Sequence, residues 1–403
     1  MSGPRNHGWA FVRRFRRGAF GWRSQPAILR IREALSEIKK AVRKDPVLGA
    51  EGAVLFLEKI SAALARVDGS SGAIGAAVNA AVDVLVPIIA KASVHEAQRE
   101  KWLDRLWAAV ESDEYSYIDQ LPDRWGELCA SLDTASRWAD SFIGTVRMSW
   151  SRDRQVAGFF RGSAACLSAL FAAGRFEEIL ELVDSAPYKS WTYRNWGVKA
   201  LAAMGRKDEA LRYAEDSRGM NESPFFIAEA CEGILLSMGR REEAYHTYSF
   251  EANRKTTYLA TFRAVASKYP ERPPREILKD LVAATPGEEG KWFAAARSAG
   301  LLEEAVELVK SSPCEPLTLI RAARDHAETE PWFALEAGLA ALRWIAEGYG
   351  YEITGRDVRE AYGRTIRAAE TVGRRDSVLS QVFQLAEKRT EGGRLLASIL
   401  KPM

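Results

Sequence analysis

One short motif, a glycine followed by charged residues and the start of an apolar stripe, occurs four times in this 403-residue chain. It reads GRFEEI at residues 174–179, GRKDEA at 205–210, GRREEA at 239–244 and GLLEEA at 300–305. The first three glycines lie 31 and 34 residues apart, and the fourth follows 61 residues later, about two periods. This period predicts a stack of helix pairs, because one pair cannot bury its apolar face alone.

The residues around each glycine predict a helix, a tight turn and a second helix. After Gly174, the apolar side chains follow one helical stripe, namely Phe176, Ile179, Leu180 and Val183. Glycine reaches the left-handed conformation that ends a helix without a Cβ clash. The acidic residues that follow suit the N-terminal dipole of the next helix, so we interpret these paired carboxylates as structural rather than as acid–base pairs. Five places after their glycines stand three small residues that permit close helix contact: Ala210, Ala244 and Ala305.

Two further segments extend the array less regularly. The stretch FRAVASKYPERPPREILKDLV at 262–282 fills the long gap, with prolines in place of the glycine turn, and residues 368–387 around Gly373 resemble a last copy. The segment TPGEEGKW at 285–292 has the wrong spacing for a phosphate-binding loop and predicts a turn between helices. Residues 347–357 predict a loop, with Thr354 or Asp357 near the start of the next helix.

The N-terminal part also has helical periodicity, and no period-two strand signal is evident. Helices are expected at Ala27–Arg43, Val47–Val67, Ala73–Ala92 and Val94–Ser112, followed by two more at 117–130 and 134–150. Asp133 or Thr134 is the expected cap of the last one. The apolar helix at 73–92 should bend or break near Pro87 and carries too many polar residues for a membrane span. We therefore expect an all-α chain with an arm at 1–26, a helical region at 27–150 and repeats at 151–403.

The glycine–alanine pairs at 205/210, 239/244 and 300/305 resemble the tetratricopeptide superfamily over about residues 155–310, extending towards 390. The resemblance implies a right-handed superhelix whose first helices line a concave groove. The chain departs from the family at Ile179, and most of the family's Trp, Leu-Gly and Pro marks are missing. Residues 50–78 and 124–131 are similar to uncharacterised bacterial helical proteins, some of whose relatives carry a SWIM zinc finger. This chain lacks the clustered Cys and His that such a finger requires.

Composition argues for a folded chain without a metal or cofactor. Hydrophobic residues make up 47%, with twelve Trp and sixteen Phe, which is ample surface to bury. The four Cys and four His are scattered, without C-x-x-C or H-x-x-x-H spacing. We considered His326, Cys129 and Cys166 as catalytic groups and favour none of them. A non-enzymatic, cytoplasmic protein is the expectation.

The N-terminal segment is the exception to this even composition. Residues 1–32 hold eight Arg and no acid, so they carry +8 and leave −5 on the rest of a chain whose total is +3. Its aromatics Trp9, Phe11, Phe15, Phe20 and Trp22 alternate with the arginines. Such a segment fits an arm packed on this protein or a partner, a nucleic-acid-binding arm, a solvated tail, or an anionic membrane surface. The arm residues expected to contact nucleic acid or an acidic partner are Arg13, Arg14, Arg16, Arg17, Trp22 and Arg23.

The leading functional hypothesis is an interaction scaffold that binds a protein or peptide in the concave groove. The expected groove residues are Tyr193, Arg194, Trp196, Lys199, Glu229 and Glu232. The alternative is a nucleic-acid-binding accessory factor that uses the arm. The partner and the oligomeric state remain open.

Overall fold

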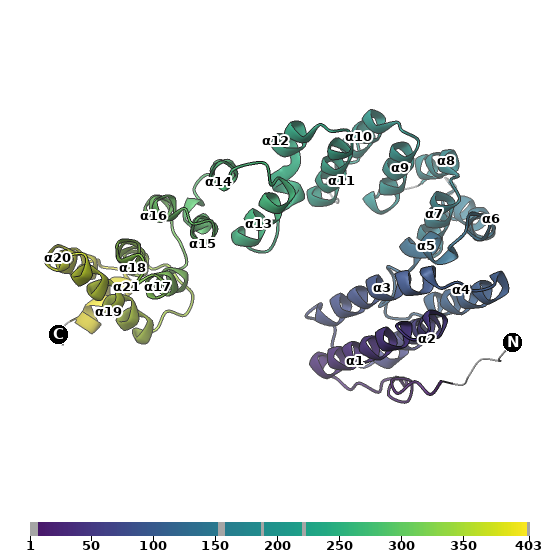
Figure 1. Cartoon of the computed structure of the whole chain (residues 1–403), viewed down its shortest axis with the longest axis horizontal. Helices are drawn as coiled ribbons and strands as arrows, with labels where there is room; N and C mark the ends of the chain where they lie inside the picture. The colour runs from purple at the N-terminus through teal and green to yellow at the C-terminus, as the bar shows by residue number, and fades with distance from the viewer. Residues whose placement is uncertain (1–6, 152–157, 187–188, 220–222, 401–403) are drawn as a thin grey trace. The chain divides into compact units, whose positions relative to one another are not determined.

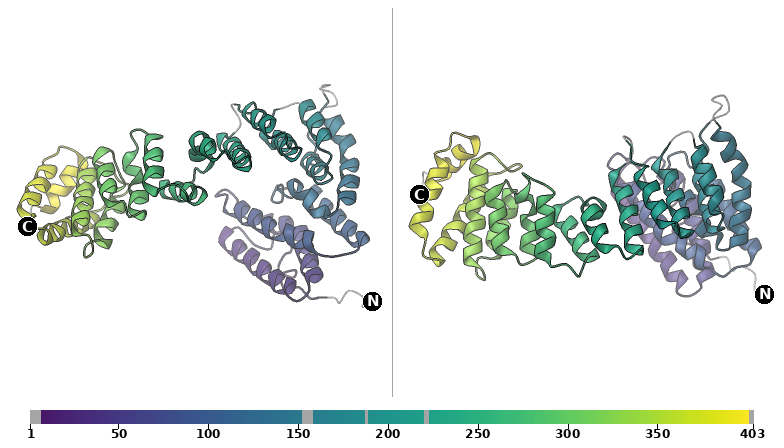
Figure 2. Two further views of the ribbon diagram at one scale, coloured as in Figure 1. Left: turned by 45° about the horizontal axis from the view of Figure 1, so that its top comes forward. Right: turned by 90° about the horizontal axis from the view of Figure 1, so that it is seen from above.

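The computed structural model describes residues 7–151, 158–186, 189–219 and 223–400. All regular elements in these ranges are helical, which confirms the all-α prediction, and helices pack in sequence order on their neighbours as an α-solenoid (Figures 1 and 2). The chain divides into two compact units, residues 1–222 and 223–403, and each is described by itself. This division falls inside the segment predicted to carry the repeats.

Unit 1 contains ten α-helices and one short 3-10 helix within its described residues. They are α1 Ser24–Val42, α2 Pro46–Leu64, α3 Ala73–Lys91, α4 Glu96–Glu111, η1 Pro122–Arg124, α5 Trp125–Cys129, α6 Leu132–Ser149, α7 Ser163–Ala172, α8 Phe176–Ser185, α9 Trp191–Ala203 and α10 Lys207–Glu215. A continuous core joins them, from the N-terminal aromatics to the side chains of α9. The expected helices at 27–43, 47–67, 73–92, 94–112 and 134–150 are confirmed.

Three local expectations in unit 1 were wrong. The helix predicted at 117–130 is a turn region followed by η1 and the five-residue α5, because the buried Asp113 carboxylate accepts the backbone N–H groups of Tyr115 and Ile118. Such bonds offer the backbone an alternative to the helix. The cap of α6 is Ser131, whose hydroxyl accepts the Thr134 N–H at 3.2 Å, rather than Asp133 or Thr134. Helix α3 continues through Pro87 to Lys91, so the alternative of a break near Pro87 is wrong, whereas the alternative of a bend there stays a prediction.

Helix α3 is also long and apolar enough to cross a membrane when length and composition alone are considered, which differs from the sequence-based expectation. Core helices of soluble proteins meet the same criterion. In unit 1, α3 packs between α1, α2 and α5, and its Val78, Leu85 and Ile89 side chains are fully buried. These buried side chains belong to the core of unit 1, and 39% of the apolar stretch of α3 is buried.

Unit 2 continues the sequence of paired helices. Its elements are α11 Pro224–Ser237, α12 Arg241–Ala252, α13 Tyr258–Lys268, α14 Pro274–Ala283, η2 Glu289–Trp292, α15 Phe293–Ser298, α16 Leu302–Ser311, α17 Pro316–Asp325, α18 Pro331–Ala346, α19 Gly355–Thr371, α20 Arg375–Ala386 and α21 Glu391–Leu400. Their core runs from Tyr245 to Leu400. Thr354 caps α19 in a reciprocal capping box with Asp357, as expected.

The glycine turns are confirmed in both units. Gly174, Gly205, Gly239, Gly300 and Gly373 all have φ between +70° and +79°. At Gly239, the Arg240 N–H donates to the Leu235 carbonyl at 2.9 Å and the glycine N–H donates to Leu236, which is a Schellman ending. The residues five places on, Ile179, Ala210, Ala244 and Ala305, are fully buried.

The proline-containing pair α13–α14 follows a different rule. No residue from 240 to 286 has a positive φ. Instead, the Thr257 hydroxyl caps α13 by accepting the Ala260 N–H at 3.1 Å, and Pro274 occupies the first turn of α14. Proline suits this position because its missing N–H would have no helical partner there.

Candidate functional site

The N-terminal arm is docked on unit 1 through its aromatic side chains. Trp9, Phe11, Phe15 and Phe20 are between 3% and 7% exposed and join the core around Phe56. Trp9 packs against Gly52 of α2, where an added Cβ would lie 2.3 Å from the indole ring. These four rings are therefore not placed to stack on the bases of a nucleic acid, and Trp22 is the arm aromatic that remains 71% exposed.

Polar contacts hold the arm beside α1. The Glu37 carboxylate of α1 accepts the N–H groups of Ala10 and Phe11 at 2.8 and 3.2 Å. Arg14 pairs with Glu33 at 2.9 Å, and Arg17 pairs with Glu114 at 3.2 Å. These ion pairs are exposed and contribute little to stability. The remaining arm cations Arg13, Arg16 and Arg23 are exposed and make no ion pair with any described residue.

Of the predicted groove residues on α9, Arg194 and Trp196 are buried. The Arg194 guanidinium donates to the Ser217 hydroxyl at 2.6 Å and lies 4.0 Å from the centre of the Tyr213 ring, so it joins α9 to the end of α10. The Tyr193 ring is half-buried, 4.6 Å from that of Trp150. A partner reaching Arg194 or Trp196 would have to displace these contacts.

Lys199 is the α9 candidate that stays exposed. Its ammonium lies 4.2 Å from the centre of the Trp196 ring, within cation–π range. The carboxyl of Asp123 in η1 interacts electrostatically with Lys199. Burial raises the pKa of Asp123, against the opposing effect of Lys199.

The two glutamates predicted on α11 have different environments. Glu229 is exposed, whereas Glu232 is fully buried. The Glu232 carboxylate accepts hydrogen bonds from the Asn253 amide at 2.8 Å and the Tyr269 hydroxyl at 2.7 Å, and it pairs with Lys268. Glu232 thus connects α11 to the residues that follow α12 and to the end of α13.

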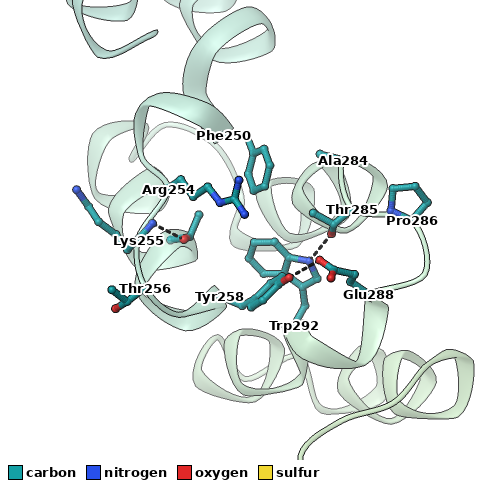
Figure 3. A pocket seen from close by; sticks show the side chains of 11 residues that line it. Phe250, Arg254, Lys255, Thr256, Tyr258, Ala284, Thr285, Pro286, Glu288 and Trp292 are labelled. Carbon is teal, nitrogen blue, oxygen red and sulfur yellow. Dashed lines mark hydrogen bonds between the residues drawn. The ribbon is translucent and has the colours of Figure 1, made fainter. Parts of the chain in front are cut away.

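A cavity of about 380 Å³ lies beside this connection, within unit 2 (Figure 3). Its walls come from the end of α12, the segment 254–261, the end of α14 and the turn before η2. The Tyr258 ring meets the buried Trp292 ring edge-on with centroids 4.7 Å apart, and Phe250 adds a third aromatic wall. The Trp292 indole donates to the Thr285 hydroxyl at 2.8 Å, which fixes this wall.

The charged side chains around this pocket differ in whether they form an ion pair. Glu288 accepts a hydrogen bond from the Tyr258 hydroxyl and pairs with Lys291 at 2.6 Å, and these two contacts lower the pKa of its carboxyl. Arg254 is exposed, points into the pocket in Figure 3, and makes no ion pair with any described residue. The pocket therefore combines an aromatic wall with an exposed guanidinium that makes no ion pair with a described residue, although it acts on Glu288 electrostatically.

Sequence reasoning did not identify this pocket. The segments 262–282 and 285–292 were both noted, one for its prolines and one as a turn, but neither was connected with Tyr258 or Arg254. The available signal was that Tyr258 and Trp292 flank the one segment in which prolines replace the glycine turn.

Other reactive side chains are poorly placed for nucleophilic chemistry. Burial raises the pKa of the Cys129, Cys166 and Cys314 thiols to about 12, so little thiolate forms at neutral pH. The His326 ring packs edge-on against Phe333. Within the described ranges, no group of three or more His, Cys, Asp or Glu side chains is arranged to hold a metal ion.

The fold and the sequential helix pairs define an α-helical repeat protein. No protein-family model matches the chain, and no curated protein matches it in sequence.

Proposed function

We propose that this protein is a non-enzymatic interaction scaffold that binds a peptide segment of a partner, with the pocket around Arg254 as one anchor point. The observation that carries the proposal is an exposed guanidinium, above an aromatic wall, that makes no ion pair with a described residue. Glu288, the nearest acid lining the pocket, is already paired with Lys291. An acidic side chain or a C-terminal carboxylate of a peptide would complete this arrangement, since arginine binds carboxylates in a bidentate manner.

The repeat architecture supports the same proposal. Helical arrays present extended surfaces on which successive turns supply side chains for binding. We also propose that the array is a divergent relative of the tetratricopeptide superfamily, because the left-handed glycines and the buried residues five places on follow that family's plan. The similarity of residues 50–78 and 124–131 to uncharacterised bacterial helical proteins remains a prediction. The four cysteines are all buried, which suits a reducing cytoplasm.

Among the groove residues predicted from sequence, Lys199 and Glu229 are exposed and remain candidates for partner contacts. The alternative, a nucleic-acid factor that stacks bases on the arm, receives less support because four arm aromatics are buried.

The experiment is a binding screen of the full-length protein against a display library of random peptides with free C-termini. Enriched peptides should carry Glu, Asp or a required C-terminal carboxylate. Arg254→Gln should weaken their binding roughly 10- to 100-fold, because a hydrogen bond to a charged group contributes about 1.5–3 kcal/mol. Arg321→Gln removes the same charge from an exposed arginine on α17 and should leave affinity unchanged. Equal affinity of the two variants would refute the role of the pocket, and no enriched peptide would refute the scaffold.

A further inference from the structure

Helix α1 carries a row of four cations on its outer face. Arg32, Lys39, Lys40 and Arg43 surround a shallow hollow together with Leu35 and Ser36. Arg32, Ser36, Lys39 and Arg43 follow one another at intervals of four, three and four residues, which places them on one side of the helix. The four cations are exposed, and none makes an ion pair with any described residue.

The docked arm makes this face more uniformly basic. Helix α1 contains two acids, Glu33 and Glu37. Glu37 accepts two backbone N–H groups from the arm and Glu33 pairs with Arg14, so both carboxylates are engaged by the arm beside the row. Residues 1–44 hold twelve Arg and Lys and two Glu, a charge of +10, whereas the rest of the chain carries −7.

Helix α19 shows that four cations on a helix do not by themselves make such a face. Arg356, Arg359, Arg364 and Arg367 also lack ion pairs with described residues. However, Asp357, Glu360 and Glu370 lie among them along the same helix. On α1, Glu33 and Glu37 also lie between Arg32 and Lys39 along the helix, but both are engaged by the arm, so neither pairs with a cation of the row.

We infer that the outer face of α1 binds the phosphate backbone of a nucleic-acid duplex, independently of base sequence. From Arg32 to Arg43 the row extends about 16 Å at 1.5 Å per residue. That length equals the rise of about five base pairs along a duplex axis, at 3.4 Å each. Lys and Arg supply the charge, and the Ser36 hydroxyl supplies a neutral donor of the kind that commonly contacts phosphate oxygens. This inference does not depend on the peptide pocket.

An anionic membrane is the competing partner for a basic face. Interfacial membrane binding combines such charge with apolar side chains that insert between lipids. Within residues 7–44, the exposed large apolar side chains are Trp22 and Leu29, both near the N-terminal end of α1, while four arm aromatics are buried. The row itself therefore offers charge without an inserting surface, which favours the nucleic acid.

The test measures binding of the full-length protein to fluorescein-labelled 20-base-pair DNA and RNA duplexes of unrelated sequences, and to phosphatidylserine vesicles. Duplexes of different sequence should bind with similar affinity. With four phosphate contacts, affinity should fall about 50-fold between 50 and 150 mM salt. A variant with Arg32, Lys39, Lys40 and Arg43 all changed to Gln should lose at least 90% of this affinity.

The matched control changes Arg356, Arg359, Arg364 and Arg367 to Gln, which removes the same net charge from α19. Its duplex affinity should remain within about twofold of the parent at 150 mM salt, where long-range effects of net charge are screened. Circular dichroism checks that both variants fold. The inference is overturned if the two variants lose affinity equally, if no duplex binds at 50 mM salt, or if vesicles bind and duplexes do not.

Discussion

The neighbouring pairs α11–α12 and α13–α14 show two ways to turn the chain within one repeat array. The first turns at Gly239, with φ +75°, and its helices pack closely through Ala244. The second contains no left-handed residue and turns through prolines. The Arg254 pocket lies where the chain passes from the first pair to the second. The pocket is lined by the segment before α13 and the segment after α14, so it flanks the pair that lacks the glycine turn rather than occupying the proline turn itself.

Breaking the Glu232 connection between these two helix pairs should cause the largest loss of stability. Glu232→Ala removes the buried carboxylate that joins Asn253, Lys268 and Tyr269, and it leaves their donors without that acceptor. The free energy of unfolding should fall by about 3 kcal/mol. Urea denaturation followed by circular dichroism measures the change.

Glu229→Ala on the same helix is the control, because Glu229 is exposed and its loss should change stability by less than about 0.5 kcal/mol. Similar losses for the two variants would mean that the Glu232 network does not hold the pairs together.

Replacing a glycine by alanine should change stability by an intermediate amount, with opposite signs in the turn and inside a helix. Gly239→Ala places a Cβ at φ +75° and should destabilise the protein by about 1 kcal/mol, with no steric neighbour to add to the strain. Gly233→Ala lies inside α11, also without neighbours within 4 Å, and should stabilise by about 0.5–1 kcal/mol. Thermal melting of both variants provides the measurement, and shifts in the same direction would contradict this account of the turn.

A substitution in the proline turn should change the stability of the protein least. Pro274→Ala keeps a helical φ in the first turn of α14 and loses mainly the restriction that proline imposes on the unfolded chain. The expected cost is about 0.5 kcal/mol, measured from the urea midpoint. A loss as large as that of Gly239→Ala would show that the two turns share one mechanism after all.

The repeat turns could be predicted because their signals are local. A glycine, the following acids and a small residue five places on specify a helix ending, a helix start and a close contact within one short segment. The segment 117–130 also looked helical locally, but the Asp113 carboxylate outside it binds the backbone in another conformation. Local periodicity does not reveal a competing acceptor of this kind.

The candidate sites depended on contacts between distant residues. Arg194 and Glu232 are polar residues that reasoning from helix position assigned to a groove, yet Ser217 and Asn253 satisfy them in the interior. The pocket required Tyr258 to meet Trp292, which lies 34 residues further along the chain. The basic character of the N-terminus was evident from the sequence, whereas the contacts of Glu33 and Glu37 with the arm were not.

The docking of the arm also has a consequence for the order in which the chain folds. Residues 9–20 are synthesised before their binding partners: Gly52 lies under Trp9, and Glu114 pairs with Arg17 across 97 residues of sequence. Contacts between sequence neighbours form early, whereas contacts over such separations must first overcome loop-closure entropy. The arm therefore cannot complete its docking until α2 has been synthesised, and until then its aromatics lack the Gly52 and Phe56 side of their binding site.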